Sequence, residues 1–236
     1  MMAVLRTNLP FDPLRDFAGV ARVGTQPYVL SVHPSFPAKS VAELVTLARA
    51  HPGELIYATN GYGMMQHLAG ELLMLRTRIR MKHVAFQGGA PSVTAVLGGH
   101  VSVAVSGIAP IVDHIAAGRL RGLAVTSRKR SPMLDDVPTV MESGVPDFDI
   151  SVSIAIMAPA ATPKVAVHRL SAEIVRVVRL SQVEASLRRI GFDIDPAGAA
   201  ELDADVHTRV EKMKQLARAA NIRVDTPEAV RKRRPE

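Results

Sequence analysis

The sequence predicts an α/β fold in which strands and helices alternate along most of the 236 residues. Three observations lead to this prediction. Short apolar runs of the strand type alternate with segments whose apolar residues recur at helical spacing. Glycine turns join several of these pairs, and an apolar content of 47% is enough to form a core. Such alternation predicts a parallel sheet with helices on both of its faces.

The strands are predicted from apolar runs that end at glycine, proline or polar residues. The segment 28–32 (YVLSV) is a buried run, and 101–106 is a buried run of small residues. In chain order, the expected strands cover residues 28–32, 55–58, 82–86, 101–106, 120–126 and 150–157.

The helices are predicted from their start signals and their apolar period. Ser40 is expected to cap the first helix, and Glu43, at its third position, would complete a capping box. Pro163 suits the first position of a later helix. In chain order, the expected helices cover residues 41–50, 64–76, 91–97, 110–116, 163–180 and 199–220. A proline-rich loop over 131–146 is expected to separate a compact α/β unit from a helix-rich unit.

The most informative segment is a glycine turn, Asn60-Gly61-Tyr62-Gly63, between an expected strand and the helix that begins near Met64. Glycines let the backbone turn sharply and approach a ligand closely, because they carry no Cβ. The helix directs unpaired N–H groups and a positive dipole end at the turn. This arrangement predicts an anion cradle that needs no charged side chain.

Two further strand ends repeat this pattern. Gln87-Gly88-Gly89-Ala90 is a second glycine turn that leads into a helix, and Ser106-Gly107 ends a buried strand just before another helix. In open α/β sheets, ligands bind at the carboxyl ends of strands, so the three ends are expected to form one cleft. Backbone contacts to the anion are expected from Gly61, Gly63, Met64, Gly88, Gly89 and Ala90. Side-chain selectivity is expected from Asn60, His67, Gln87 and Ser106.

Other interpretations of the first turn stay open at this point. A dinucleotide fingerprint would need a third glycine where Gln66 stands, and an acidic residue about twenty positions further on, where 81–83 reads Met-Lys-His. A purely structural tight turn is the other alternative. No serine lies in a nucleophile elbow and no paired carboxylates form an acid/base motif, so no catalytic residue is predicted. The chain has no cysteine, and its histidines show no metal-site spacing, so no metal or cofactor is predicted either.

The charge of the chain is weak evidence for a nucleic-acid partner. The net charge is +7, but the densest basic run, 231–234, lies at the C-terminus and is expected to be a solvated tail. Only 4% of residues are aromatic and none is Trp, which argues against a stacking platform for single strands. We therefore expect no nucleic-acid partner. The sequence also contains no stretch typical of a membrane span and no apolar region of a signal peptide.

Several segments carry a resemblance to a known family. They read LPFDPLRDF (9–17), HPSFPAKSVAELVTLARAHPGELIYATNGYG (33–63), QHLAGELL (66–73), GGAPSVTAVLGGHV (88–101), AAGRLRGLAVTSRKRSPMLDDVPTVMESGVP (116–146) and APAATPKVAVHRLSAEI (158–174). In this order they resemble the extracytoplasmic solute receptors of tripartite tricarboxylate transporters, the Bug receptors. The likeness runs from about residue 9 to about residue 224.

The resemblance implies a periplasmic-binding-protein fold of the second type, with two α/β lobes that close on a small carboxylate. Residues 29–148 would form the second lobe, and residues 1–28 with 149–236 would belong to the first. The implied location is the periplasm, and the implied partners are the carboxylate and the membrane permease subunits of the transporter. We expect a monomeric, non-enzymatic receptor without a cofactor. The alternatives are a small-molecule enzyme with a phosphate or nucleotide cradle at the glycine turns, and a truncated remnant that binds nothing.

The sequence departs from the family pattern in ways that bear on ligand identity. Met64 stands where a serine is usual, Phe86-Gln87 where Tyr-Lys is usual, and Ser102 and Ser106 where aspartates are common. Ser153-Ile154 replaces an aromatic pair at the lobe crossover. The family also carries an upstream segment with a signal peptide and a ligand-contacting loop, so the first lobe is expected to be incomplete at its N-terminus. The side-chain changes are expected to alter which acid is selected more than the fold, whereas the missing upstream segment is expected to affect binding itself.

Overall fold

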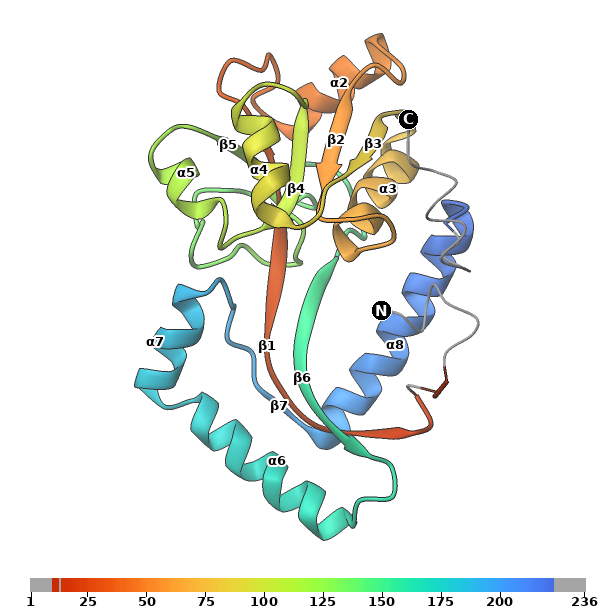
Figure 1. Cartoon of the computed structure of the whole chain (residues 1–236), viewed down its shortest axis with the longest axis vertical. Coiled ribbons are helices and arrows are strands. Elements are labelled where there is room, and N and C mark those ends of the chain that lie inside the picture. The colour runs from red at the N-terminus through yellow and green to blue at the C-terminus, as the bar shows by residue number, and fades with distance from the viewer. Residues whose placement is uncertain (1–9, 13, 223–236) are drawn as a thin grey trace. The chain divides into compact units, whose positions relative to one another are not determined.

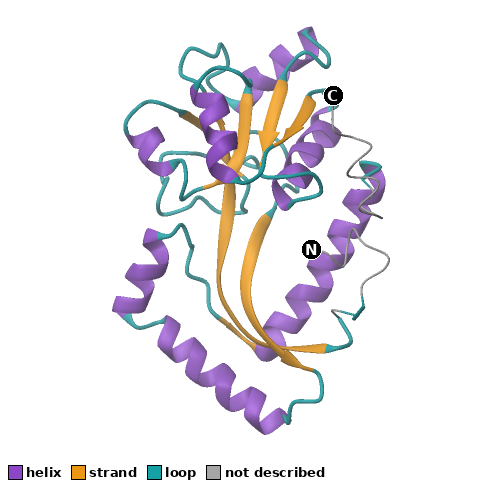
Figure 2. Cartoon of the chain, in the orientation of Figure 1, coloured by secondary structure: helices purple, strands orange, loops and turns teal. Residues whose placement is uncertain are grey.

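The structure is a computed structural model that describes residues 10–12 and 14–222. The basic run 231–234 and the ends of the expected first lobe lie outside these residues. The strands are β1 (Phe17–Val32), β2 (Ile56–Thr59), β3 (Lys82–Ala85), β4 (Val103–Gly107), β5 (Arg121–Val125), β6 (Ser151–Pro159) and β7 (Ala197–Gly198). The helices are α2 (Val41–Ala50), α3 (Met65–Thr77), α4 (Gly89–Leu97), α5 (Val112–Ala116), α6 (Lys164–Val178), α7 (Ser181–Arg189) and α8 (Ala199–Ala219). Strands and helices alternate from β1 to β5, whereas the strands β5 and β6, and then the helices α6 and α7, follow one another directly (Figures 1 and 2).

Each expected strand and helix has a counterpart in the structure, and α2 has the expected bounds. Two elements, α7 and β7, were not expected. β1 begins at Phe17, well before the expected strand start at residue 28. The first part of β1 was not predicted as strand, because it contains two glycines and is followed by Pro27, and these residues weaken a strand pattern. Pairing with β6 and β7 keeps this part extended in spite of them.

The prediction of a parallel sheet is wrong for β1. The strand order is β3-β2-β4-β1-β5, in which β2 is parallel to β3 and β4, whereas β1 runs antiparallel to both β4 and β5. The helix α2 therefore connects two strands that run in opposite directions, whereas the helix of a βαβ unit connects parallel strands. Alternation in the sequence does not distinguish these two connections.

The chain divides into two compact units. Unit 2 contains residues 25–152 and 186–193, and unit 1 contains the described residues of 1–24, 153–185 and 194–222. The lobe boundaries expected from the sequence lie at 28/29 and 148/149, whereas the main divisions between the units lie at 24/25 and 152/153. The segment 186–193, expected in the first lobe, packs in unit 2, where Asp193 exchanges backbone hydrogen bonds of 2.9 and 2.8 Å with Thr25.

The core of unit 2 fixes the position of α3 on the sheet. Tyr57 of β2 is fully buried, and its ring lies against Gly70 of α3. A Cβ on Gly70 would approach Tyr57 Cε2 to 2.3 Å, so only glycine allows this contact. The intrinsic cost of a glycine inside a helix is therefore offset by close packing of α3 against β2.

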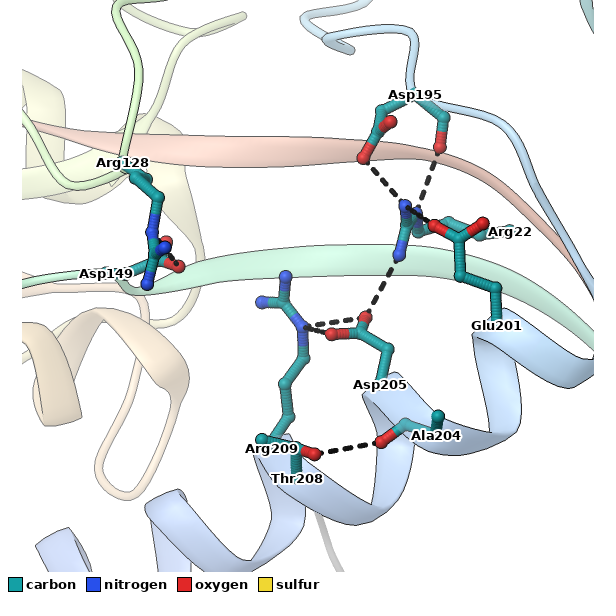
Figure 3. Close-up of polar contacts among 9 residues, drawn as sticks. All are labelled: Arg22, Arg128, Asp149, Asp195, Glu201, Ala204, Asp205, Thr208 and Arg209. Atoms are coloured by element: carbon teal, nitrogen blue, oxygen red, sulfur yellow. Dashed lines mark hydrogen bonds and ion pairs between the residues drawn. The ribbon is translucent and has the colours of Figure 1, made fainter.

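In unit 1, the side chain of Arg22 on β1 holds together three segments of the chain (Figure 3). Its guanidinium is nearly buried and donates to the backbone oxygen of Asp195 at 2.9 Å and to that residue's carboxylate at 2.8 Å. Two carboxylates of α8 also accept, Glu201 at 3.3 Å and Asp205 at 3.2 Å. In unit 2, Arg128 forms a more exposed pair with Asp149 at 3.7 Å.

We expect Arg22→Ala to lower the free energy of unfolding of unit 1 by about 2–3 kcal/mol, because several charge-assisted hydrogen bonds are lost at once. Urea unfolding followed by circular dichroism measures this change. Arg176→Ala is the matched control, because its pair with Glu173 is exposed and is expected to contribute below about 1 kcal/mol. Equal changes in the free energy of unfolding for the two substitutions would contradict the conclusion that the hydrogen bonds of Arg22 stabilise unit 1.

Candidate functional site

The carboxyl ends of β2, β3 and β4 lie at one edge of the sheet, because these strands are parallel. The loops that follow them contact one another. Phe86 N–H donates to Thr59 O at 2.9 Å, and Gly88 N–H donates to Asn60 O at 3.3 Å. A Cβ on Gly89 would lie 3.5 Å from Asn60 Nδ2 and 3.6 Å from Pro110 Cγ. The structure thus brings together the three loops in which the sequence predicts a cleft.

Two of the helices that begin at this edge, α3 and α4, have no side-chain cap and no acidic residue in the first turn, whereas the short helix α5 has Asp113 there. The helix that begins at the opposite edge, α2, is different (Figure 1). Ser40 Oγ accepts from Glu43 N–H at 3.2 Å, while the Glu43 carboxylate accepts from Lys39 N–H at 2.7 Å instead of completing a box with Ser40. The positive ends of α3 and α4 are therefore left without an internal anion.

The glycines shape the first turn, and their N–H groups have partners inside the protein. Gly61 N–H donates to Thr59 Oγ1 at 3.3 Å, and Gly63, at φ 72°, donates to His67 Nδ1 at 3.0 Å. Met64 N–H donates to Gly61 O at 3.4 Å, and Gly88 N–H is bonded to Asn60 O. Four of the six predicted backbone donors are thus already engaged.

The N–H groups without a partner in the described chain lie slightly further along. They belong to Met65, Gln66 and His67 in the first turn of α3, and to Gly89 and Ala90 in the first turn of α4. The general rule that the first N–H groups of a helix have no internal partner identifies these residues, once the helix starts are known. The helix predicted from the sequence begins at residue 64, one residue before the observed start of α3 at Met65, so the unpartnered N–H groups of α3 were assigned too early in the chain.

The four side chains predicted to confer selectivity lie in different surroundings. Gln87 is exposed, and Asn60 is half-buried with an Oδ1 atom that is buried and has no partner among residues 10–12 and 14–222. Ser106 is fully buried within β4, and its hydroxyl donates to Gly107 O at 3.4 Å. His67 is 3% exposed and points into the protein, where it contacts the turn from behind. Gln87 is therefore the one of the four that lies open at the edge, and Asn60 is partly exposed there.

Behind the turn at 60–63 lies a buried cluster of polar side chains that the sequence patterns do not predict. Tyr57 donates its hydroxyl to Glu71 Oε1 at 2.7 Å, and His67 Nε2 lies 3.4 Å from the same oxygen. Thr59 Oγ1 and His83 Nε2 share a hydrogen bond of 2.7 Å. The rings of His67 and His83 are stacked, with their centroids 3.9 Å apart. The signal for this cluster is the pairing of β2 with β3, which places position 83 beside position 57.

Burial controls the protonation of this cluster. Burial lowers the pKa of His83 to about 3, and the neighbouring His67 acts in the same direction. Burial and the nearby Glu71 carboxylate raise the pKa of Tyr57, so its hydroxyl stays protonated and can donate. Burial acts to raise the pKa of Glu71, but hydrogen bonds from His67 and Tyr57 outweigh it and hold that pKa below its usual value. The cluster thus holds an ionised carboxylate and a neutral His83.

Metal binding and membrane insertion find no support in the part of the chain that the structure describes. No three His, Asp or Glu side chains are grouped there as they would be around a metal ion. None of the helices in that part is both long and apolar enough to span a bilayer.

Comparison with known proteins gives a family for the chain. The family model described as "Tripartite tricarboxylate transporter family receptor" matches residues 2–222. A protein of Pseudomonas sp. strain P51, encoded in the tcbD-tcbE intergenic region, is 34% identical over 200 residues, which cover 84% of this chain and 59% of the relative. Protein BugT of Bordetella pertussis is 37% identical over 164 residues, which cover 69% of this chain and 50% of BugT. The chain thus spans between half and two thirds of the length of these relatives.

A solved structure is similar over most of the chain. The structure of R. palustris Rpa4515 with adipate has 29% sequence identity and a TM-score of 0.82, and the match covers 94% of this chain and 74% of that protein. This agreement confirms the predicted class of fold, that of periplasmic solute-binding proteins.

The low pKa of His83 predicts a pH dependence of stability. In the unfolded chain this pKa is about 6.5, so folding favours the neutral ring. The stabilisation is present above pH 6.5 and is lost as the pH falls toward the folded value of about 3. Between pH 6.5 and pH 4 we expect the free energy of unfolding to fall by about 1–3 kcal/mol from this residue. Urea unfolding at several pH values, compared between the wild type and His83→Gln, measures the contribution.

The substituted protein should show a flatter pH profile than the wild type. His51→Gln serves as the control, because His51 is exposed and contacts Glu54 at the surface. Parallel pH profiles of His83→Gln and the wild type would show that His83 is not buried in its neutral form.

Proposed function

Because this chain belongs to the receptor family of tripartite tricarboxylate transporters, we propose that it binds a small carboxylate at the edge where α3 and α4 begin and delivers it to membrane permease subunits. The observation that carries the proposal is the set of five N–H groups without internal partners at two uncapped helix starts. These donors are oriented for an anion, and each helix dipole adds about 0.3–1 kcal/mol to its binding.

A dicarboxylate suits this arrangement better than a monocarboxylate. Two separate helix starts face the same edge, and each can hold one carboxylate through its first-turn N–H groups. The Rpa4515 structure was solved with adipate, a dicarboxylate, which makes adipate a reasonable first probe. The exposed Met64, at the same edge, offers an apolar contact for a methylene chain.

The remaining parts of the proposal rest on the family. We propose that the chain acts in the periplasm as a monomeric receptor, without a catalytic role, a cofactor or a nucleic-acid partner. The two units would then correspond to the lobes that the resemblance implies. Selectivity among acids would come from Asn60 and Gln87, since Gln87 is exposed and Asn60 is half-buried near the free N–H groups.

Thermal melting with a panel of di- and tricarboxylates, amino acids, aromatic acids and nucleotides tests the function. A ligand that binds only the folded state raises Tm by mass action. We expect adipate or another dicarboxylate to raise Tm and nucleotides to leave it unchanged. A shift with nucleotides alone would favour the enzyme with a phosphate cradle, and no shift with any acid would contradict carboxylate binding by this chain.

Substitution of Met65 by proline tests the backbone donors directly. Met65 is the first residue of α3, and its N–H has no partner in the described chain, so Met65→Pro removes a proposed ligand donor but no internal hydrogen bond. Met64 is already extended, at φ −75° and ψ 164°, as a residue before proline must be. We expect an affinity for adipate lower by about tenfold, with Tm nearly unchanged, because one hydrogen bond to a charged group is lost.

Isothermal titration and thermal melting of three variants complete this test. Met65→Ala removes the side chain but keeps the N–H, and it should retain most of the affinity. Lys164→Pro makes the same backbone change at the first position of α6, after the extended Pro163 in unit 1, and should leave the affinity unchanged. Equal affinities of Met65→Pro and Met65→Ala would show that this N–H does not contact the carboxylate.

A further inference from the structure

A chain of polar contacts connects the glycine turn to the side of α3 that faces β2. It begins with a hydrogen bond from Gly63 N–H to His67 Nδ1 at 3.0 Å and continues with a contact of 3.4 Å between His67 Nε2 and Glu71 Oε1. It ends at Tyr57, whose hydroxyl donates to the same Glu71 oxygen at 2.7 Å. His67 and Tyr57 are buried, and Glu71 is half-buried between them.

The direction of these bonds fixes the tautomer of His67. Because Nδ1 accepts from Gly63 N–H, it carries no proton, and a neutral ring must then carry its proton on Nε2. That proton faces Glu71, and an ionised carboxylate can only accept hydrogen bonds. With a proton on Nδ1, two donors would face each other and the bond to Gly63 would be lost. Glu71 therefore selects the tautomer that holds the turn.

A second contact holds the first half of the same turn. Thr59 Oγ1 accepts from Gly61 N–H at 3.3 Å and shares a hydrogen bond with His83 Nε2 at 2.7 Å. The two histidine rings stack at 3.9 Å, so each limits the rotation of the other. The turn is thus held at Gly61 by Thr59 and at Gly63 by His67.

We propose that Glu71 is a positioning residue of the anion site, which acts through His67 to hold Gly63 and so directs the free N–H groups of Met65 and Gln66 toward the ligand. This inference rests on the proposed function and deepens it. Glu71 and His67 do not touch the ligand. They keep Gly63 at φ 72°, which turns the chain into α3 with its first N–H groups at the strand edge. A binding site assembled before the ligand arrives does not lose affinity to ordering of the turn.

Glu71→Leu and Glu71→Gln separate this role from packing. Leucine has no acceptor for His67 Nε2–H, whereas the glutamine amide oxygen can accept from both His67 and Tyr57. We expect Glu71→Leu to bind adipate about tenfold more weakly than the wild type, and Glu71→Gln to stay within about twofold of it. Glu54→Leu is the matched control, because Glu54 pairs with His51 at the surface at 3.1 Å, and it should not change the affinity.

Nuclear magnetic resonance of protein labelled with ¹⁵N in histidine and in the backbone gives a readout that does not depend on the ligand. In the wild type, His67 should carry its proton on Nε2, and the Gly63 amide should exchange slowly with solvent; comparison with His67→Asn assigns the ring signals. In Glu71→Leu, the His67 tautomers should mix and the Gly63 amide should exchange faster. If Glu71→Leu does not fold, Glu71→Asp, which withdraws the carboxylate by one methylene, takes its place with the same expected changes.

A wild-type His67 with its proton on Nδ1 would overturn the proposal, and so would a Glu71→Leu protein with unchanged tautomer and affinity. If the wild type does not bind adipate at all, the proposed function fails for this anion. The tautomer and the exchange rate of the Gly63 amide then decide by themselves whether Glu71 holds the turn.

Discussion

Parallel pairing of β2 with β3 and β4 is the constraint on which the proposed site depends. It places three strand ends, and the starts of the helices that follow them, at a single edge of unit 2. Each helix start has N–H groups that the helix itself cannot satisfy. At the other edge, Ser40 caps one first-turn N–H group of α2, that of Glu43, while α3 and α4 have no side-chain cap. The first N–H groups of α3 and α4 are thus left open where the strands end.

The residues around the first glycine turn have different roles. Gly61 and Gly63 allow the shape of the turn, and their own N–H groups are used to hold it. His67 and His83 lie behind the turn, and burial keeps His83 neutral, so the anion would meet neutral groups and backbone donors. In the proposed site, the partial charge of the helix starts would take the place of a cationic side chain.

The sequence predicted most of this fold, because apolar period, capping residues and glycine turns are local signals. The expected bounds of α2 agree with the structure, and the three loops predicted to converge do so. The direction of β1 was missed, because the same alternation of elements fits a helix between antiparallel strands. The roles of Glu71 and His83 were missed because they depend on long-range contacts, such as the pairing of β2 with β3. His67 was predicted to lie at the site, and its burial could not be anticipated from its position on the helix.

Recognition of charge and recognition of a particular acid have different sources in this molecule. Backbone N–H groups bind any carboxylate of suitable size, since they contact only its oxygens. In the proposed site, the identity of the acid would then be determined by the side chains beside them, which are Asn60, Met64 and Gln87. Met64 suits methylene groups, and the unpartnered Oδ1 of Asn60 suits a hydroxyl donor or a bridging water. A receptor of this kind can change its substrate by replacing edge side chains while the turn, the helix starts and the buried histidines stay the same.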